Sequence, residues 1–147
     1  MIPDHEIIIR LLEAALLGGL IGIERERAGQ PAGLRTHIIL TIGAALAMVL
    51  SINIAMQFRP DVPNGDPARL AAQVISGIGF LGAGAILRYG ASIKGLTTAT
   101  SLWTLAIVGM AVGAGYYMVG AAVTTLLLLV LYGLNWIEHR FIRPATQ

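Results

Sequence analysis

Long runs of apolar residues dominate the chain, and short polar segments separate them. A helix needs about 20 mostly apolar residues to cross the hydrocarbon of a bilayer. Residues 95–137 contain no Lys, Arg, Asp or Glu and are too many for one crossing, so we divide them at the glycine-containing segment 113–117. The pattern therefore predicts five membrane-spanning helices, at residues 7–23, 36–56, 70–87, 98–112 and 117–137.

The composition supports this interpretation. The 147 residues are 56% hydrophobic and only 12% charged, with a net charge of +2 and no cysteine. Soluble domains carry about 25% charged residues, so the apolar excess points to lipid. We predict a single transmembrane domain over 1–147, an all-α polytopic bundle in contact with the lipid bilayer. The scattered basic residues indicate no nucleic-acid partner.

Charges between the predicted spans suggest an orientation. Seven basic residues fall on one side of the membrane: Arg25, Arg27, Arg35, Arg88, Lys94, Arg140 and Arg143. The positive-inside rule then places the N-terminus outside and the C-terminus in the cytoplasm. Asp4 and Glu6 stand where a secretory signal would be basic, so we expect the first span to belong to the working protein.

The stretch "GIGFLGAG", residues 77–84, contains the G-x-G-x-x-G spacing of a dinucleotide-binding loop. That motif requires a preceding strand and an acidic residue about 20 positions later. No strand is predicted here, and residues 67–137 contain no Asp or Glu, so we expect no nucleotide. Close packing of helices in lipid explains these glycines better, although a glycine-weakened helix that opens a gate or exposes carbonyls is the alternative. The helix-packing candidates are Gly18, Gly22, Gly77, Gly79, Gly82 and Gly84.

Four stretches together resemble the signature blocks of the MgtC/SapB family, in the same order. They are "GGLIGIERE" (18–26), "AGLRTH" (32–37), "QVISGIGFLGAGAIL" (73–87) and "KGLTTATSLW" (94–103). The resemblance implies a multi-pass protein of the bacterial inner (plasma) membrane, linked to magnesium homeostasis and to stress or virulence adaptation. It also implies membrane partners, such as a transport protein or ATP synthase. Many relatives carry a C-terminal soluble domain, which we expect this chain to lack.

Charged residues at the predicted cytoplasmic ends of the first two spans form one candidate site. These ion-pair or gating candidates are Glu24, Arg25, Arg35 and His37. They either anchor the helix ends at the lipid headgroups or form a surface for partner docking or gating. We expect Glu24, Arg25 and Arg35 to pair. A histidine can titrate near physiological pH, but a single interfacial histidine is often without a functional role.

A second set of polar residues lies within or beside the spans. These polar-pathway candidates are Glu13, Gln73, Ser76, Thr97, Thr98 and Ser101. A carboxylate in hydrocarbon needs a partner, and Arg10, three residues before Glu13, is the nearest one. The pair is either structural or part of a cation or proton pathway. The hydroxyls either cap the fourth span, line a water-filled vestibule with Gln73 and Ser76, or bind an anion at the start of that helix.

The chemistry favours a non-enzymatic role. Mg²⁺ prefers six oxygen ligands, and Glu13 is the only carboxylate within the spans, so we expect no resident cofactor and no dedicated cage in one subunit. Passage of a hydrated Mg²⁺ ion through a symmetric dimer remains an alternative. Our leading hypothesis is a homo-oligomer, with a dimer favoured, that regulates magnesium-linked physiology through membrane partners. The alternative is a transporter or channel for a cation (Mg²⁺) or a small solute.

Overall fold

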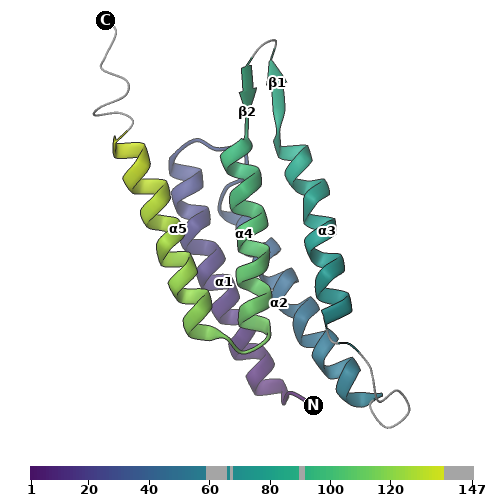
Figure 1. Cartoon of the computed structure of the whole chain (residues 1–147). Helices are drawn as coiled ribbons and strands as arrows, with labels where there is room; N and C mark the ends of the chain where they lie inside the picture. Colours follow the sequence, from purple (N-terminus) through teal and green to yellow (C-terminus); the bar gives the residue numbers. More distant parts are fainter. Residues whose placement is uncertain (59–65, 67, 90–91, 138–147) are drawn as a thin grey trace, which may run out of the picture.

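Five helices lie side by side in the computed structural model, which describes residues 1–58, 66, 68–89 and 92–137 (Figure 1). They are α1 (Asp4–Arg27), α2 (Leu34–Gln57), α3 (Ala68–Ala85), α4 (Leu96–Gly113) and α5 (Tyr117–Ile137). The predicted all-α helical bundle is confirmed. By length and composition, α2, α3 and α4 are each able to cross a bilayer.

A short β-hairpin between α3 and α4 was not predicted. Strands β1 (Leu87–Tyr89) and β2 (Ser92–Lys94) pair antiparallel, with Leu87 opposite Lys94 and Arg88 opposite Ile93. The expected third helix ran to residue 87, whereas α3 ends at Ala85. Figure 1 shows the hairpin projecting beyond the helices, at the end of the bundle where α1 ends and α2 and α4 begin; we call this the hairpin end.

A glycine makes the passage from β2 into α4 feasible. Gly95 has φ +88°, a conformation that side chains disfavour, and a Cβ atom there would lie 1.9 Å from the Ala85 carbonyl oxygen. The end of α3 therefore approaches the start of α4 backbone to backbone. This close approach places the first turn of α4 beside the last turn of α3.

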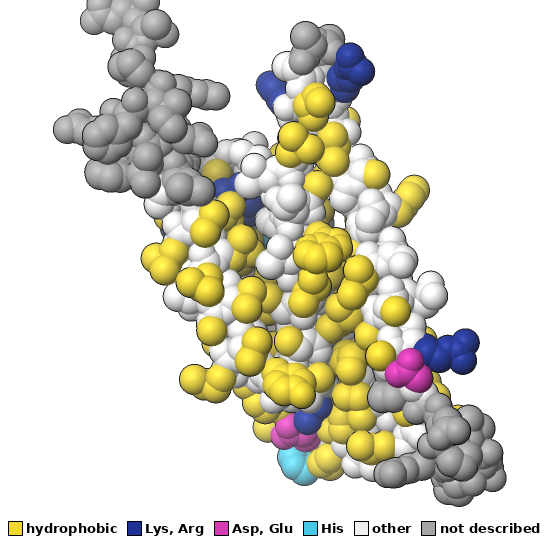
Figure 2. Space-filling view, viewed as in Figure 1, with side chains coloured by type: hydrophobic (Ala, Val, Ile, Leu, Met, Phe, Trp, Pro, Cys, Tyr) yellow, Lys and Arg dark blue, Asp and Glu magenta, His cyan; other side chains and the backbone are white. Residues whose placement is uncertain are grey.

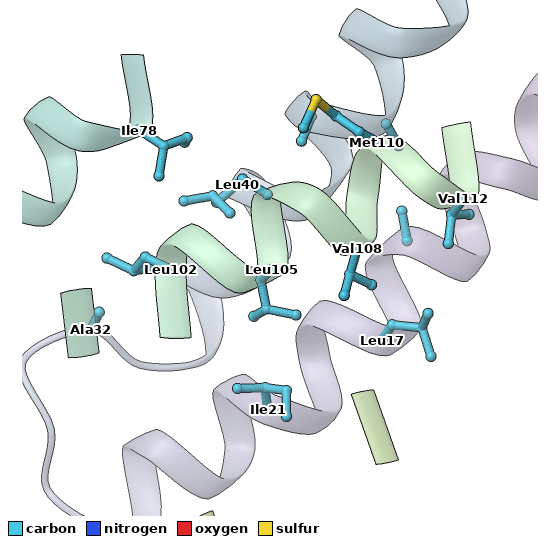
Figure 3. Close-up of a cluster of buried hydrophobic side chains, with 14 of the residues drawn as sticks. Leu17, Ile21, Ala32, Leu40, Ile78, Leu102, Leu105, Val108, Met110 and Val112 are labelled. Carbon is cyan, nitrogen blue, oxygen red and sulfur yellow. The ribbon is translucent and has the colours of Figure 1, made fainter. Parts of the chain in front are cut away.

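The centre of the bundle is α4, which packs against each of the other four helices. Its side chains Leu105, Val108 and Val112 are at most 2% exposed. Figure 3 shows them beside Leu17 and Ile21 of α1. Apolar side chains therefore fill the interior between α1, α2 and α4.

Glycines allow α1 and α4 to approach α2 closely. A Cβ at Gly18 would lie 2.8 Å from the His37 carbonyl oxygen, and one at Gly22 would lie 2.7 Å from the Leu34 Cα. On α4, a Cβ at Gly109 would lie 2.4 Å from the carbonyl oxygen of Thr41. No larger residue fits these positions without displacing backbone, so these glycines belong to the interhelical contacts.

Helix α3 is much more exposed than α4. Its buried residues are Ile78 and Gly82, and Phe80 is 82% exposed. A Cβ at Gly82 would make ordinary contact with Ala99, at 3.7 Å. Hypothetical Cβ atoms at Gly77, Gly79 and Gly84 would have no neighbour within 4 Å. The glycine-rich stretch therefore does little packing within the described part of one chain.

At the opposite end of the bundle, Arg10 of α1 joins three elements. It donates to the Gly113 carbonyl oxygen at 2.7 Å and forms an ion pair with Glu6 at 3.2 Å. The Tyr117 hydroxyl also donates to the Glu6 carboxylate. Arg10 thus pairs with Glu6 and not, as expected, with Glu13. This arrangement ties the start of α1 to the turn between α4 and α5.

Candidate functional site

A buried polar cluster lies near the hairpin end, where α1 ends and α2 and α4 begin. We use this name for six residues: Glu24, Arg25, Gln30, His37, Thr98 and Ser101. His37 and Thr98 are fully buried, and Ser101 is 1% exposed. Buried polar groups are normally hydrogen-bonded, so each of these side chains should be matched to a partner.

His37 connects α2 to α4. Its Nδ1 lies 2.8 Å from the Gly33 carbonyl oxygen, which can only accept, so Nδ1 carries a proton. Its Nε2 lies 3.4 Å from Ser101 Oγ, and that hydroxyl is also 2.8 Å from the Thr98 carbonyl oxygen. With a neutral imidazole, the single proton of the Ser101 hydroxyl is shared between two acceptors, His37 Nε2 and the Thr98 carbonyl oxygen.

Gln30 joins the segment after α1 to α4. Thr98 Oγ1 donates to Gln30 Oε1 at 3.3 Å, and the backbone N–H of Gln30 donates to the Arg25 carbonyl oxygen at 3.0 Å. Nearby, a Glu26 carboxylate oxygen accepts from the Leu34 backbone N–H at 2.7 Å, which satisfies a free donor in the first turn of α2. The segment between α1 and α2 is therefore held by hydrogen bonds on both sides.

Glu24 and Arg25 form a buried ion pair, as expected. They are 3% and 5% exposed, and Arg25 Nη2 donates to Glu24 Oε1 at 2.6 Å while Nε donates to the other carboxylate oxygen. The interaction is bidentate, and the two charges cancel. Arg35, which we expected to join it, is exposed and makes no ion pair within the described residues.

The structure brings together some of the predicted pathway residues and separates others. Ser101 contacts His37 and Thr98 contacts Gln30, whereas Thr97 is exposed one position away. Gln73 and Ser76 are exposed on α3, and Ser76 donates only to the Ala72 carbonyl oxygen of its own helix. Glu13 is half-buried on α1 and forms no ion pair with Arg10, which pairs with Glu6 instead.

The cluster has no oxygen set suited to Mg²⁺. Glu24 supplies its only carboxylate, and Arg25 donates to both of its oxygens. Across the described ranges, no group of three or more His, Asp or Glu residues is placed to hold a metal. The cluster links α2, α4 and the segment between α1 and α2 by hydrogen bonds.

The bundle and its long apolar helices define an α-helical membrane protein. The sequence profile of the MgtC family matches residues 11–140, and the chain belongs to this family. The expected MgtC/SapB resemblance is thereby confirmed.

Named relatives agree with this assignment. "Putative magnesium transporter YhiD" of Escherichia coli K12 is 46% identical over 86% of this chain and 59% of its own length. "Protein SapB" of Bacillus subtilis is 41% identical over 93% of this chain and 60% of its own. "Protein MgtC" of Salmonella typhimurium 14028s is 44% identical over 82% of this chain and 49% of its own. The chain thus spans about half to three-fifths of these relatives, and no solved structure matches it.

Proposed function

We propose that the protein is a multi-pass bacterial inner-membrane protein that regulates magnesium-linked physiology through partners in the bilayer, as a homo-oligomer. Membership of the MgtC family and the three membrane-length helices support the setting. Membrane transporters and ATP synthase are the partner classes implied by the family resemblance. The names of the relatives support only the link to magnesium.

The distribution of packing in the bundle is the observation that carries this proposal. Leu105, Val108 and Val112 fill the space between α4 and its neighbours, so the middle of one chain offers no wide polar route among these residues. By contrast, α3 turns most of its surface outward, and Phe80 projects from it at 82% exposure. Figure 2 shows apolar side chains spread over the outer surface of the helices. Such a surface suits contact with other membrane helices.

Magnesium transport is the second candidate function. The name of the YhiD relative favours it, since that protein is 46% identical to this chain over their matched residues. The filled interior would then require a hydrated ion to pass between subunits.

One experiment separates the two functions. The purified protein is reconstituted into liposomes that contain a Mg²⁺-sensitive dye, and an Mg²⁺ gradient is imposed. The regulator proposal expects flux no greater than in empty liposomes. Flux that follows the gradient and is lost in Glu24→Gln would reject it in favour of transport.

A cellular measurement tests the surface directly. Growth at limiting Mg²⁺ is compared for Phe80→Gln and for Met118→Gln, a matched change on α5, because these side chains are 82% and 83% exposed. We expect Phe80→Gln to impair growth and Met118→Gln to leave it unchanged, at equal protein levels. Equal growth of the two variants would contradict a partner surface on α3.

A further inference from the structure

Helix α1 lies alongside α2 from end to end. The backbone N–H of Ile2, just before α1, donates to Asn53 Oδ1 near the end of α2 at 2.7 Å. At the other end of the pair, a carboxylate oxygen of Glu26 accepts from the Leu34 N–H at 2.7 Å. Both helices have 24 residues, and α2 is able by length and composition to cross a bilayer. A bilayer crossed by α2 is therefore crossed by α1 as well.

Glu13 lies deep within this span. At 1.5 Å per residue of α-helix, it is about 14 Å along the axis from Asp4 at the start of α1 and about 21 Å from Arg27 at its end. The hydrocarbon core of a bilayer is about 30 Å thick. With that core centred on α1, the backbone of Glu13 lies about 11 Å inside the nearer boundary, which is farther than a glutamate side chain reaches.

The side of α1 that carries Glu13 has an exposed apolar surface. Ile9, Leu16 and Leu20 lie on the same side of the helix, at spacings of four, three and seven residues from it, and are 50%, 62% and 42% exposed. Glu13 itself is half-buried, at the border between these side chains and the buried Leu17. In a bilayer this surface contacts acyl chains, so the Glu13 carboxyl group lies beside hydrocarbon.

The nearest cation along the chain, Arg10, is occupied by other groups. Its guanidinium forms an ion pair with Glu6 at 3.2 Å and donates to the Gly113 carbonyl oxygen at 2.7 Å. The Tyr117 hydroxyl of α5 also donates to the Glu6 carboxylate. Neither Arg10 nor Tyr117 therefore compensates a charge on Glu13.

The helices packed against α1 supply no ion-pair partner for Glu13 among the described residues. These helices are α2, α4 and α5, and the last two contain no Lys, Arg, Asp or Glu. The ionisable residues of α2, Arg35 and His37, lie in its first turn at the hairpin end, and Tyr132 lies near the end of α5. An unpaired carboxylate in hydrocarbon is costly, and protonation removes that cost.

We propose that Glu13 is a proton-binding site inside the bilayer, with a carboxyl group that stays protonated at neutral pH and faces the acyl chains. Release of this proton requires water or a cation to reach the middle of α1. A cation of a second subunit is the competing partner, and labelling in the membrane separates it from a proton. The site requires only that the bundle lies in a bilayer, so its failure would leave the proposed regulatory function standing.

Reaction with an apolar carbodiimide tests the site. The full chain in liposomes is treated at pH 7 with dicyclohexylcarbodiimide, digested and analysed by mass spectrometry. A protonated acid adds across one C=N bond of the reagent: the acid oxygen bonds to the carbon, and the proton passes to a nitrogen. Where water is excluded, the acyl group then migrates to a nitrogen and gives a stable N-acylurea, with no leaving group. We expect this adduct on Glu13.

Other glutamates of α1 serve as controls within the same protein. Glu26 is exposed, and Glu24 is in the ion pair with Arg25. A glutamate in water has a pKa of about 4.3 and is almost fully ionised at pH 7, so labelling of Glu13 should exceed that of Glu26 by about tenfold or more. Glu13→Gln should abolish the adduct. Glu26→Gln, which keeps an oxygen to accept from the Leu34 N–H, should leave it unchanged.

Infrared spectroscopy detects the proton without depending on access of a reagent. The unaltered protein in liposomes at pH 7 is compared with Glu13→Gln. We expect the unaltered protein to show the carbonyl band of a protonated carboxylic acid, and the variant to lack it. Identical spectra in this region would show that Glu13 is ionised and would overturn the proposal.

Three labelling results would also overturn it. Equal labelling of Glu13 by a water-soluble carbodiimide would place the carboxyl group in water. Labelling that appears only after the protein is dispersed as a monomer in detergent would show that a second copy or a partner covers Glu13 in the membrane. Absence of the adduct in both settings would contradict contact with the acyl chains.

Discussion

Helices α3 and α4 are neighbours joined by the hairpin, and both carry small residues four positions apart, yet they pack in opposite ways. On α4, Gly109 and Gly113 each lie so close to the α2 backbone that a Cβ would come within 2.4 Å of a carbonyl oxygen. On α3, a Cβ at Gly79 would meet nothing within 4 Å. Small-residue spacing therefore indicates that a helix is able to pack closely, and it does not say against what.

The same contrast applies to polar residues. The polar residues that are buried near the hairpin end are hydrogen-bonded, whereas Gln73 and Ser76 of α3 are exposed. These buried residues are Glu24, Arg25, His37, Thr98 and Ser101. Matched substitutions in the two regions should therefore differ in their effect on the free energy of unfolding. That quantity can be followed by SDS titration of the protein in mixed micelles.

The largest difference should come from removing one partner of the buried ion pair. Arg25→Met leaves the Glu24 carboxylate buried and unpaired, which should lower the free energy of unfolding by about 3–5 kcal/mol. Arg69→Met on α3 removes an exposed charge and should change it by less than about 0.5 kcal/mol. Equal effects in the two variants would contradict the burial of the pair. The double variant Glu24→Gln/Arg25→Met should recover part of the loss.

A smaller difference is expected from adding a methyl group to a glycine. Gly109→Ala places that methyl 2.4 Å from the Thr41 carbonyl oxygen and should cost about 1–3 kcal/mol of unfolding free energy. Gly79→Ala meets no atom and should be neutral or stabilise α3 by up to about 1 kcal/mol, because alanine favours helix. If Gly79→Ala proved as harmful as Gly109→Ala in a dispersed monomer, the contrast between the helices would fail. If Gly79→Ala lowered the free energy of unfolding only in an oligomer, Gly79 would lie at a contact between subunits.

The smallest difference concerns single hydroxyl groups. Ser101→Ala removes the hydrogen bond to the Thr98 carbonyl oxygen and the contact with His37 Nε2, which should cost about 1 kcal/mol. Ser76→Ala removes only a local bond at 3.3 Å to the exposed Ala72 carbonyl, so little change in unfolding free energy is expected. The two variants are compared in the same micelles. A Ser101→Ala protein as stable as the unaltered one would show that His37 does not depend on this hydroxyl.

Most of the helices could be predicted from the sequence because length and apolar composition decide whether a segment can cross a bilayer. The predicted fifth span, 117–137, coincides with α5. The hairpin was missed because its strands have three residues each and follow an apolar run without a charge or proline to end the helix. Gly95 lies against the Ala85 carbonyl at the end of α3, and this tertiary contact is not visible in the local sequence.

The candidate site was predicted less completely. Glu24 and Arg25 are adjacent in sequence, so their pairing needed no knowledge of the fold. The Gln30 to Thr98 hydrogen bond joins residues 68 positions apart, and nothing in the local sequence marks Gln30 as a partner. Burial of His37 likewise depends on which face of α2 meets α4. Arg35 lies two residues before His37 and therefore on a different side of the helix, which is why it remains outside the ion pair.

The central place of α4 has a consequence for how the chain is made. A ribosome synthesises α1, α2 and α3 before α4, yet the contacts that close the interior come from α4. Until α4 emerges, His37 lacks the Ser101 hydroxyl and Gln30 lacks the Thr98 hydroxyl that they contact in the finished bundle. A chain truncated before residue 96 would therefore hold an unfinished polar pocket.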